Sequence, residues 1–224
     1  MSDEEAVNTE RWNDNFAILM ESRLASLYRK IMLYRSQFTA LLADKEKRIV
    51  DIGCGFGASL AYLWSQGYRN LAAIEPDARL TKNFPAHMKV DLRHCKAEKI
   101  DFPDQSFDAV LVYGILHHLD GLDAYWAACD EIERILKPGG FVFIIEPGRY
   151  WVLVMLEPIF KALGLISKTF KAYGQHMDEE WPEQRFFLKN HGLVRNYLLR
   201  KGFQTRVDDY CIYTWLFTIQ KSQT

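Results

Sequence analysis

A buried apolar run followed at once by three closely spaced glycines constrains this chain more than any other feature. The run Ile49–Ile52 leads directly into Gly53, Gly55 and Gly57. Glycine lets a backbone turn tightly and approach a ligand without a Cβ clash. The helix expected after the turn directs its N-terminal amides at the same place. The segment therefore predicts a ligand-binding turn between a buried strand and a helix.

Short apolar runs alternate with amphipathic stretches from Ile49 to about Pro147. Runs that are apolar throughout are typical of strands buried on both faces of a parallel sheet, with helices on either side. The predicted strands are Ile49–Ile52, Leu71–Ile74, Ala109–Val112 and Phe141–Ile145, with Met88–Val90 as a weaker candidate. The predicted helices are Ser59–Gln66, Asp77–Asn83 and Leu122–Leu136, the last ending at the turn signal Lys137–Gly140. The pattern predicts an α/β fold.

The flanking segments complete this fold. Thr9–Leu42 has apolar residues at helical spacing and predicts one long or two shorter helices. Asn190–Lys201 predicts a helix that stops at Gly202. Two strands follow, at Phe203–Asp209 and Tyr213–Gln220, and their short connection indicates antiparallel pairing. We therefore expect a mostly parallel sheet with one antiparallel strand near an edge.

Composition excludes several classes of protein. The chain has 28 Lys and Arg against 29 Asp and Glu, so the basic excess that attracts nucleic-acid phosphates is missing. The four cysteines form no CxxC pair, and no histidine lies at metal spacing from them, so no metal site is expected. The acidic N-terminus lacks a secretory pattern, which favours a cytoplasmic location.

The glycine turn alone leaves two classes of cofactor open. Gly53, Gly55 and Ala58 satisfy the dinucleotide pattern G-x-G-x-x-G/A, and Glu75 lies roughly 20 residues further on. In the dinucleotide fold an acid at that spacing binds the ribose. Other segments must decide between the classes.

Four segments together resemble the class I S-adenosylmethionine-dependent methyltransferases, in their small-molecule branch. They are VDIGCGFG at 50–57, AAIEPD at 72–77, AEKIDFPDQSFDAVLVYGILHHL at 97–119 and ILKPGGFVFIIEP at 135–147. They occur in the family's order and cover roughly Arg48–Pro147. The resemblance implies S-adenosylmethionine as cofactor and a Rossmann-like, doubly wound, seven-stranded sheet with helices on both faces.

The resemblance also implies that residues 1–224 form a single methyltransferase domain. Residues 1–47 would be an N-terminal helical lid and residues 48–147 the cofactor-binding core. Residues 148–189 would be an apolar insertion or lid after the fifth strand. Residues 190–224 would supply the last helix and the strand pair.

Positions that match the family's motifs carry implied roles in cofactor binding. The methionine end of the cofactor is expected at Asp51, Gly53, Cys54 and Gly55. The ribose hydroxyls are expected at Glu75, with Pro76 beside the adenine, Ala97 and Glu98 in the adenine loop, and Gly114 under the cofactor. Relatives commonly place Asp before that alanine, where this chain has Lys96. Because an ammonium accepts no hydrogen bond, the adenine amino group must use Glu98, a backbone carbonyl or water.

The implied reaction is an in-line transfer of a methyl group from a cationic sulfur, with release of S-adenosylhomocysteine. Such an enzyme mainly aligns the reactants and excludes water. A general base is needed only when the acceptor must lose a proton. His117 and His118 are candidates for this base; in the alternative they are family architecture, one bonded to backbone and the other lining the pocket. Further pocket candidates, as positioning residues, are Tyr113, Glu146, Arg149, His176 and His191.

The sequence favours a small-molecule or lipid-like acceptor over nucleic acid. No (Asn/Asp)-Pro-Pro-(Tyr/Phe) motif and no Pro-Cys or Thr-Cys dipeptide is present, which argues against methylation of nucleic-acid bases. The segment Arg149–Lys171 is strongly apolar, but charges and a proline interrupt it before the ~20 apolar residues that a membrane span requires. Three interpretations stay open: a lid over an apolar acceptor, core or dimer surface, or peripheral contact with a membrane through Lys161, Lys168 and Lys171.

Two other functions compete with methyl transfer. The chain would be a cofactor-binding catalyst that transfers no methyl group, such as a cyclase, or an accessory subunit; Lys96 is the sequence hint for this alternative. A nicotinamide-dependent reductase is the weaker alternative, because dinucleotide-binding families do not carry the FPDQSFD, HHL and LKPGG elements of this chain.

Overall fold

The computed structural model describes residues 23–223 except 83, 85–86, 150–151, 153–154, 156–157, 160–161, 164, 166–167 and 212–213, and the side chains of residues 23–25, 168–170 and 172–180 are not described either. Several predictions therefore lie outside the described residues. They concern residues 9–22 of the N-terminal helical segment and 11 of the 23 residues of the apolar segment Arg149–Lys171.

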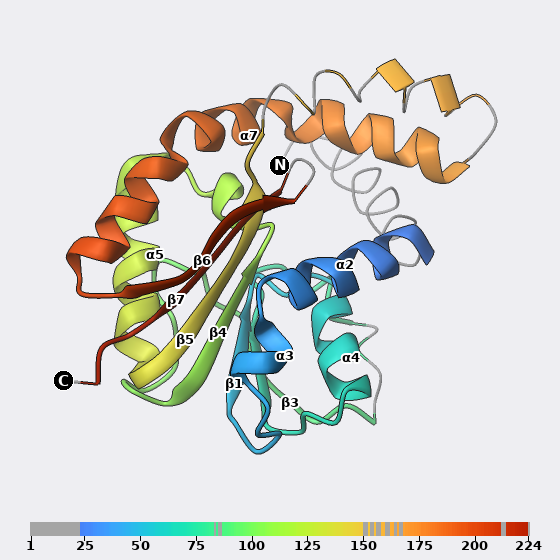
Figure 1. The fold of residues 1–224 in the computed structure, drawn as a ribbon. Coiled ribbons are helices and arrows are strands. Elements are labelled where there is room, and N and C mark those ends of the chain that lie inside the picture. Colours follow the sequence, from blue (N-terminus) through green and yellow to red (C-terminus); the bar gives the residue numbers. More distant parts are fainter. Residues whose placement is uncertain are drawn as a thin grey trace.

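Seven strands of the described chain form one sheet in the order β3-β2-β1-β4-β5-β7-β6 (Figure 1). Strand β7 runs antiparallel to its neighbours β5 and β6, and all other pairs are parallel. This arrangement confirms the predicted doubly wound sheet with a single antiparallel strand. The strands are β1 (Ile49–Ile52), β2 (Leu71–Ile74), β3 (Val90–Arg93), β4 (Phe107–Tyr113), β5 (Leu136–Pro147), β6 (Gln204–Cys211) and β7 (Thr214–Gln220).

Helices cover both faces of the sheet, because the strand residues alternate between two apolar cores. On one face lie α2 (Arg23–Arg35), α3 (Phe38–Leu41) and α4 (Ala58–Ser65) (Figure 1). On the other lie α5 (Gly121–Ile135) and α7 (Lys168–Arg200). Ile49 packs in the core under the first group, whereas Val50 and Ile52 pack in the core under the second.

Most predicted elements are present, with shifted ends. β3 begins at Val90, where the weaker candidate Met88–Val90 ends. The helix predicted from Asn190 is the end of α7, which begins at Lys168. Helix α5 ends before Lys137–Gly140, as predicted. These four residues, however, belong to β5, which begins at Leu136 opposite Phe107 of β4.

The predicted helix Asp77–Asn83 is wrong, since residues 78–82 form turns. Oδ1 of Asp77 accepts a hydrogen bond from the backbone N–H of Arg79 at 2.9 Å, and the Asp77 carboxylate also pairs with the Arg79 guanidinium at 2.6 Å. Asp bonds of this kind compete with helical hydrogen bonds. In a helix of one or two turns, the few backbone hydrogen bonds formed by propagation stabilise the helix too little to outweigh these side-chain bonds.

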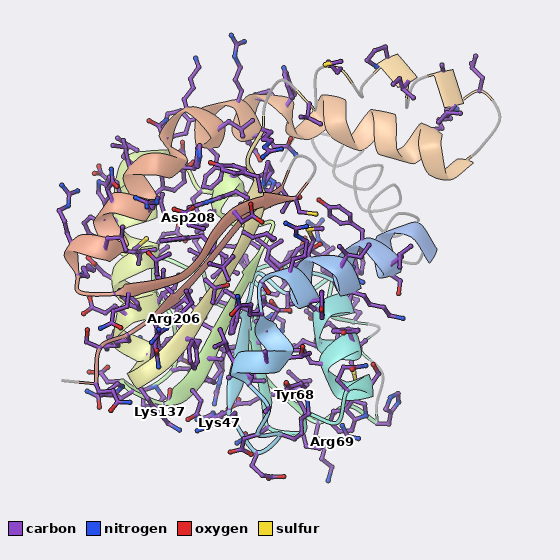
Figure 2. The ribbon with its side chains drawn as sticks, in the orientation of Figure 1. Lys47, Tyr68, Arg69, Lys137, Arg206 and Asp208 are labelled. Atoms are coloured by element: carbon purple, nitrogen blue, oxygen red, sulfur yellow. The ribbon has the colours of Figure 1, made fainter. Side chains whose placement is uncertain are left out.

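The amino end of the parallel strands is held by charge pairs. Lys47 and Lys137 lie near one another at this end (Figure 2) and approach the Asp108 carboxylate at 3.5 and 3.0 Å. The carboxyl ends lie at the opposite edge, where the strand order reverses between β1 and β4. Ligands bind at this switch point in open α/β sheets.

Within the part of the chain that the structure describes, no helix combines the length and apolar character that crossing a bilayer requires.

Candidate functional site

The glycine turn after β1 depends on glycine for both its conformation and its packing. Gly53 has φ +67°, and a Cβ at this position would lie 2.4 Å from Cγ2 of Ile115, which follows β4. Gly57 has φ +75° and precedes the first turn of α4. The backbone N–H groups of Gly53 and Cys54 donate to the carbonyl of Ile74 at 2.9 and 3.1 Å. The turn is thereby held against the ends of β2 and β4.

Glu75 links the glycine turn to the segment after β2. The side chain is buried, with one oxygen accepting from the Gly55 N–H at 2.9 Å and the other from the Asp77 N–H at 3.0 Å. A carboxylate offers about four lone-pair sites, so further donors can still bind these two oxygens. Glu75 therefore lies where the predicted ribose acid was expected and keeps the capacity to accept hydroxyl groups.

Asp51 is a second buried carboxylate, two residues before Gly53. It lies in β1 opposite Ala73 of β2 and Leu111 of β4 and is 2% exposed. Burial raises the pKa of Asp51 to about 7, against the lowering effect of the Arg29 guanidinium, and Glu75 adds to the rise. Ionised Asp51 is costly in this place, so a cationic ligand would relieve it.

Arg29 of α2 is a site residue that the sequence predictions missed. It is 6% exposed, and burial lowers its guanidinium pKa while Tyr113 and Asp51 raise it. The signal that would have found it is its spacing. Arg29 shares a helix face with Met32 and Leu33, which are fully buried, so a cation sits inside an apolar stripe.

Cys54 lies in the glycine turn as a neutral thiol. It is 8% exposed, and burial raises its pKa far above the usual range, with Asp51 and Glu75 acting in the same direction. A thiolate nucleophile is excluded by this environment. The side chain therefore contributes to packing around the turn.

The predicted adenine residues follow β2 and β3, at the same edge of the sheet. The Glu75 N–H donates to the Arg93 carbonyl at 3.1 Å, which brings the ends of these strands together. Ala97 is buried and Glu98 half-buried, whereas Pro76 and Lys96 are exposed. Lys96 thus points its charge toward water, and its replacement of the usual acid leaves no buried cation.

Glu146 organises the chain that follows β4. Its Oε1 accepts from the backbone N–H groups of Ile115 and Leu116, both at 2.7 Å, and its Oε2 lies 2.7 Å from Nδ1 of His117. The short helix η1 (Leu116–His118) is therefore attached to the end of β5. Gly114 adjoins this turn, since a Cβ at Gly114 would lie 3.9 Å from Cε1 of His117.

The two histidines of η1 have different surroundings. His117 is 4% exposed and bonds to a carboxylate, whereas His118 lies at the surface with Nδ1 2.6 Å from Oε2 of Glu183 on α7. Their ring centroids are 4.1 Å apart. The described hydrogen bond of each histidine goes to a carboxylate. The structure adds Glu183, which sequence reasoning missed, to the residues around the site.

The other pocket candidates are only partly placed. The structure puts Tyr113, half-buried, at the end of β4. Tyr210 joins two of the others: its hydroxyl is 3.0 Å from Nε2 of His191, and the Arg149 guanidinium lies 5.0 Å from its ring centroid. The His176 side chain lies outside the described set. Among the described residues, no three His, Cys, Asp or Glu side chains are grouped to hold a metal ion.

Residues 50–144 match the family model described as "Methyltransferase domain". These residues are a class I methyltransferase domain. The match spans β1 to β5 of the described fold and includes Asp51, the glycine turn, Glu75 and η1. It supports S-adenosylmethionine as the cofactor of the domain, as the sequence predicted.

The names of curated proteins that are similar to this chain mention different methyl acceptors. A protein named "Probable tRNA methyltransferase 9B" from Mus musculus is 29% identical over 62% of this chain and 32% of its own length. A ubiquinone/menaquinone biosynthesis C-methyltransferase from Cupriavidus taiwanensis is 34% identical over 43% of this chain and 37% of its own. A demethylmenaquinone methyltransferase from Clavibacter sepedonicus is 29% identical, over 62% and 60%. The chain spans about a third of the length of the first two.

Solved structures confirm the fold. The PH0226 protein from Pyrococcus horikoshii OT3 aligns with a TM-score of 0.62 at 15% identity, over 91% of this chain and 93% of that one. An S-adenosylmethionine-dependent methyltransferase from Mesorhizobium loti aligns with a TM-score of 0.54 at 17% identity, over 83% and 98%. The fold shared with these structures thus extends beyond residues 50–144 to most of the chain.

Proposed function

We propose that this chain transfers a methyl group from S-adenosylmethionine to a small apolar or amphipathic acceptor. The observation that carries the proposal is the pair of buried carboxylates, Asp51 and Glu75, on either side of the glycine turn. The methyltransferase domain match over the same residues supports it.

The donor set fits the cofactor group by group. Asp51 would hold the methionine ammonium, because a cation offsets the cost of its buried charge. Glu75 would accept the ribose hydroxyls on its remaining lone pairs. Gly53, Cys54 and Gly55 would give the backbone surface against the methionine end. Pro76, Ala97 and Glu98 would border the adenine, and Gly114 would lie beneath the cofactor.

When bound, S-adenosylmethionine would supply a methyl group on a cationic sulfur. The acceptor would form a bond to this methyl group, and the sulfur would keep the electron pair of the broken S–C bond. The residues of the chain have to hold the acceptor in line and exclude water. Where the acceptor carries a proton, His117 is the stronger candidate base. Its Nδ1 is fixed by Glu146, which leaves Nε2 as the nitrogen that takes the proton. His118 is exposed and pairs with Glu183, so it is the weaker of the two candidate bases.

Two quinone-modifying relatives support a lipid-like acceptor. Residues of the segment Arg149–Lys171 that the structure describes also support it, since Met155, Ile159 and Leu165 are exposed. A lid over the acceptor and a peripheral contact with a membrane both suit such residues. Co-sedimentation of anionic vesicles with wild type and a Met155→Asp/Leu165→Asp variant separates the two. Binding by wild type that the variant loses supports the membrane contact, and no binding by wild type excludes it.

The function is tested first by calorimetry with S-adenosylmethionine and S-adenosylhomocysteine. We expect both to bind at one site, and absence of binding to folded protein would overturn the proposal. Transfer of a labelled methyl group is then measured on a panel of short-chain demethylquinols and other amphipathic small molecules. Cofactor binding without transfer to any member would favour a non-methylating catalyst or an accessory subunit.

A second candidate acceptor is tRNA, because a relative with that name aligns over 62% of this chain. The balance of 28 basic and 29 acidic residues weighs against it, since tRNA binding relies on phosphate contacts. Unmodified tRNA is therefore included in the same labelled assay. Transfer to tRNA with none to small molecules would replace the proposed acceptor class while leaving the cofactor assignment intact.

A further inference from the structure

Helix α2 carries apolar side chains on the face that does not pack against the sheet. Leu27, Ile31 and Tyr34 are neighbours at helical spacing, and all three are exposed, Leu27 to 56% and Tyr34 to 76%. We call these three residues the α2 stripe. Exposed apolar side chains that occur singly are ordinary, whereas adjoining ones on one helix face indicate contact with another surface.

The charges beside the α2 stripe are basic. The sequence of α2 contains arginines and a lysine but no acidic residue. Among its described side chains, Lys30 and Arg35 are exposed together with the stripe. The whole chain balances 28 basic residues against 29 acidic ones, so the charge of this helix departs from that of the chain. An apolar helix face with basic neighbours is typical of a helix that lies on an anionic membrane surface.

Contacts with the antiparallel end of the sheet hold α2 in place (Figure 1). The Tyr28 and Thr214 hydroxyls are hydrogen-bonded, which ties the helix to the start of β7. Arg35 pairs with Asp209 of β6 at 2.6 Å, which partly offsets the charge of Arg35. The α2 stripe is therefore presented by a helix whose orientation relative to the sheet is set by the fold.

The opposite face of α2 borders the candidate site. Met32 and Leu33 are fully buried, and they pack in the same core as Cys54 of the glycine turn and Tyr113 at the end of β4. One helix thus separates the α2 stripe from the site. Since a helix with its side chains is roughly 10 Å across, a surface on the stripe would lie about that far from the site.

We infer that the α2 stripe docks on an anionic membrane surface, with its apolar side chains in the lipid interface and Lys30 at the phosphate headgroups. A tyrosine such as Tyr34 is favoured at this depth, because its ring is apolar and its hydroxyl is polar. The inference deepens the proposed function and rests on it, since a membrane in this place would deliver a lipid-like acceptor to the site. It concerns a different surface from the exposed apolar residues between 155 and 165.

Co-sedimentation tests the inference, with vesicles of phosphatidylcholine alone and of phosphatidylcholine mixed with phosphatidylglycerol. Wild type is compared with Ile31→Asp, Tyr34→Asp and the matched control Leu193→Asp. Ile31 and Leu193 are 41% and 42% exposed, but Leu193 lies on α7, which covers the other face of the sheet. We expect wild type and Leu193→Asp to bind the anionic vesicles, less so at high salt. Each α2 variant should bind at least about tenfold more weakly.

Failure of wild type to bind the anionic vesicles would overturn the inference. So would wild-type binding by the α2 variants, or an equal loss in Leu193→Asp. Sedimentation equilibrium without lipid covers a second copy of the chain: self-association that Ile31→Asp abolishes, with no vesicle binding, would assign the stripe to that copy instead. If Ile31→Asp does not fold by circular dichroism, Tyr34→Asp decides, because its side chain is the more exposed.

Calorimetry with S-adenosylmethionine on the same samples separates this inference from the proposed function. We expect unchanged cofactor affinity in the three variants, because none of the substituted side chains lies in the cofactor site. Cofactor binding without vesicle binding would overturn the docking surface alone. Vesicle binding by a folded wild type that binds no cofactor would overturn the proposed function and leave the docking surface in place.

Discussion

His117 and Glu146 form a buried pair in which Nδ1 of the imidazole lies 2.7 Å from Oε2 of the carboxylate. The other oxygen of Glu146 accepts two backbone N–H groups from the turn that joins β4 to η1. One carboxylate on β5 therefore satisfies three donors on the neighbouring strand connection. This places Glu146 among the residues that hold the site together rather than among those that react.

Replacing Glu146 with alanine should destabilise the fold strongly, because it leaves buried donors without an acceptor. We expect a loss of about 2–4 kcal/mol in the free energy of unfolding. For a chain of this size that is a fall of roughly 5–15 °C in Tm. Glu146→Gln keeps one acceptor oxygen and should lose less. Glu133→Ala is the matched control, since its partially exposed pair with Lys201 should contribute less than about 1 kcal/mol. Thermal melts by circular dichroism measure all three; equal melting of Glu146→Ala and Glu133→Ala would contradict the assignment.

The histidines of η1 should differ in their effect on turnover. If His117 is the base, His117→Gln should slow transfer to a proton-bearing acceptor by about 10²- to 10⁴-fold without changing S-adenosylmethionine affinity. His118→Gln should change turnover little, because its ring lies at the surface. The pH–rate profile of each variant, with the acceptor that the panel identifies, measures the effect. A wild-type profile in His117→Gln would assign the histidine pair to the architecture of the turn.

Gly53→Ala tests the close approach of the glycine turn to Ile115. The new methyl group would meet Cγ2 of Ile115 at 2.4 Å in a backbone with positive φ. Gly67→Ala is a control for the backbone alone, since Gly67 has φ +94° with no atom within 4 Å of an added Cβ. The left-handed backbone costs about 1–2 kcal/mol at either position. We expect Gly53→Ala to lose at least a further ~1 kcal/mol in urea unfolding and to bind the cofactor weakly. Equal losses would show that Ile115 moves aside freely.

The residues that sequence analysis located are those encoded by local patterns. Continuous apolar runs predicted β1, β2 and β4, and the glycine spacing predicted the turn, because strand burial and positive φ constrain neighbouring residues. The family motifs pointed to Glu75, which follows β2 and accepts a hydrogen bond from Gly55 of the glycine turn.

Arg29 and Glu183 escaped prediction because their roles depend on distant contacts. Arg29 lies on α2, which is tied to β7 by a hydrogen bond between residues 186 positions apart. Glu183 meets His118 across 65 positions. The helix predicted at Asp77–Asn83 failed for the opposite reason, since a local side-chain bond from Asp77 outweighed helix propensity. Helical spacing marks Arg29 as a buried residue, but the contacts between distant segments that place Arg29 and Glu183 leave no periodic trace in a single sequence.

Asp51 should make both stability and cofactor affinity depend on pH near neutrality. Its pKa is raised by burial to about 7, above the value of about 3.9 in an unfolded chain. Between these values the folded state binds the extra proton, so stability falls as pH rises from about 4 to 7 and stays lower above it. The slope approaches 1.4 kcal/mol per pH unit within the window. Asp51→Asn should remove this slope, while Asp101→Asn, at an exposed position, should keep it.

Cofactor affinity should change in the opposite direction with pH, because the ammonium needs ionised Asp51. We expect the Kd for S-adenosylmethionine to rise up to about tenfold per unit as pH falls below 7, and Asp51→Asn to bind weakly at every pH. Urea unfolding and calorimetry from pH 5.5 to 8.5 measure the two trends together. If the unfolding free energy of Asp51→Asn depends less on pH and the variant does not bind S-adenosylmethionine, the carboxylate of Asp51 serves ligand binding and destabilises the folded state. Wild-type affinity that is constant across this range would contradict its role as the ammonium partner.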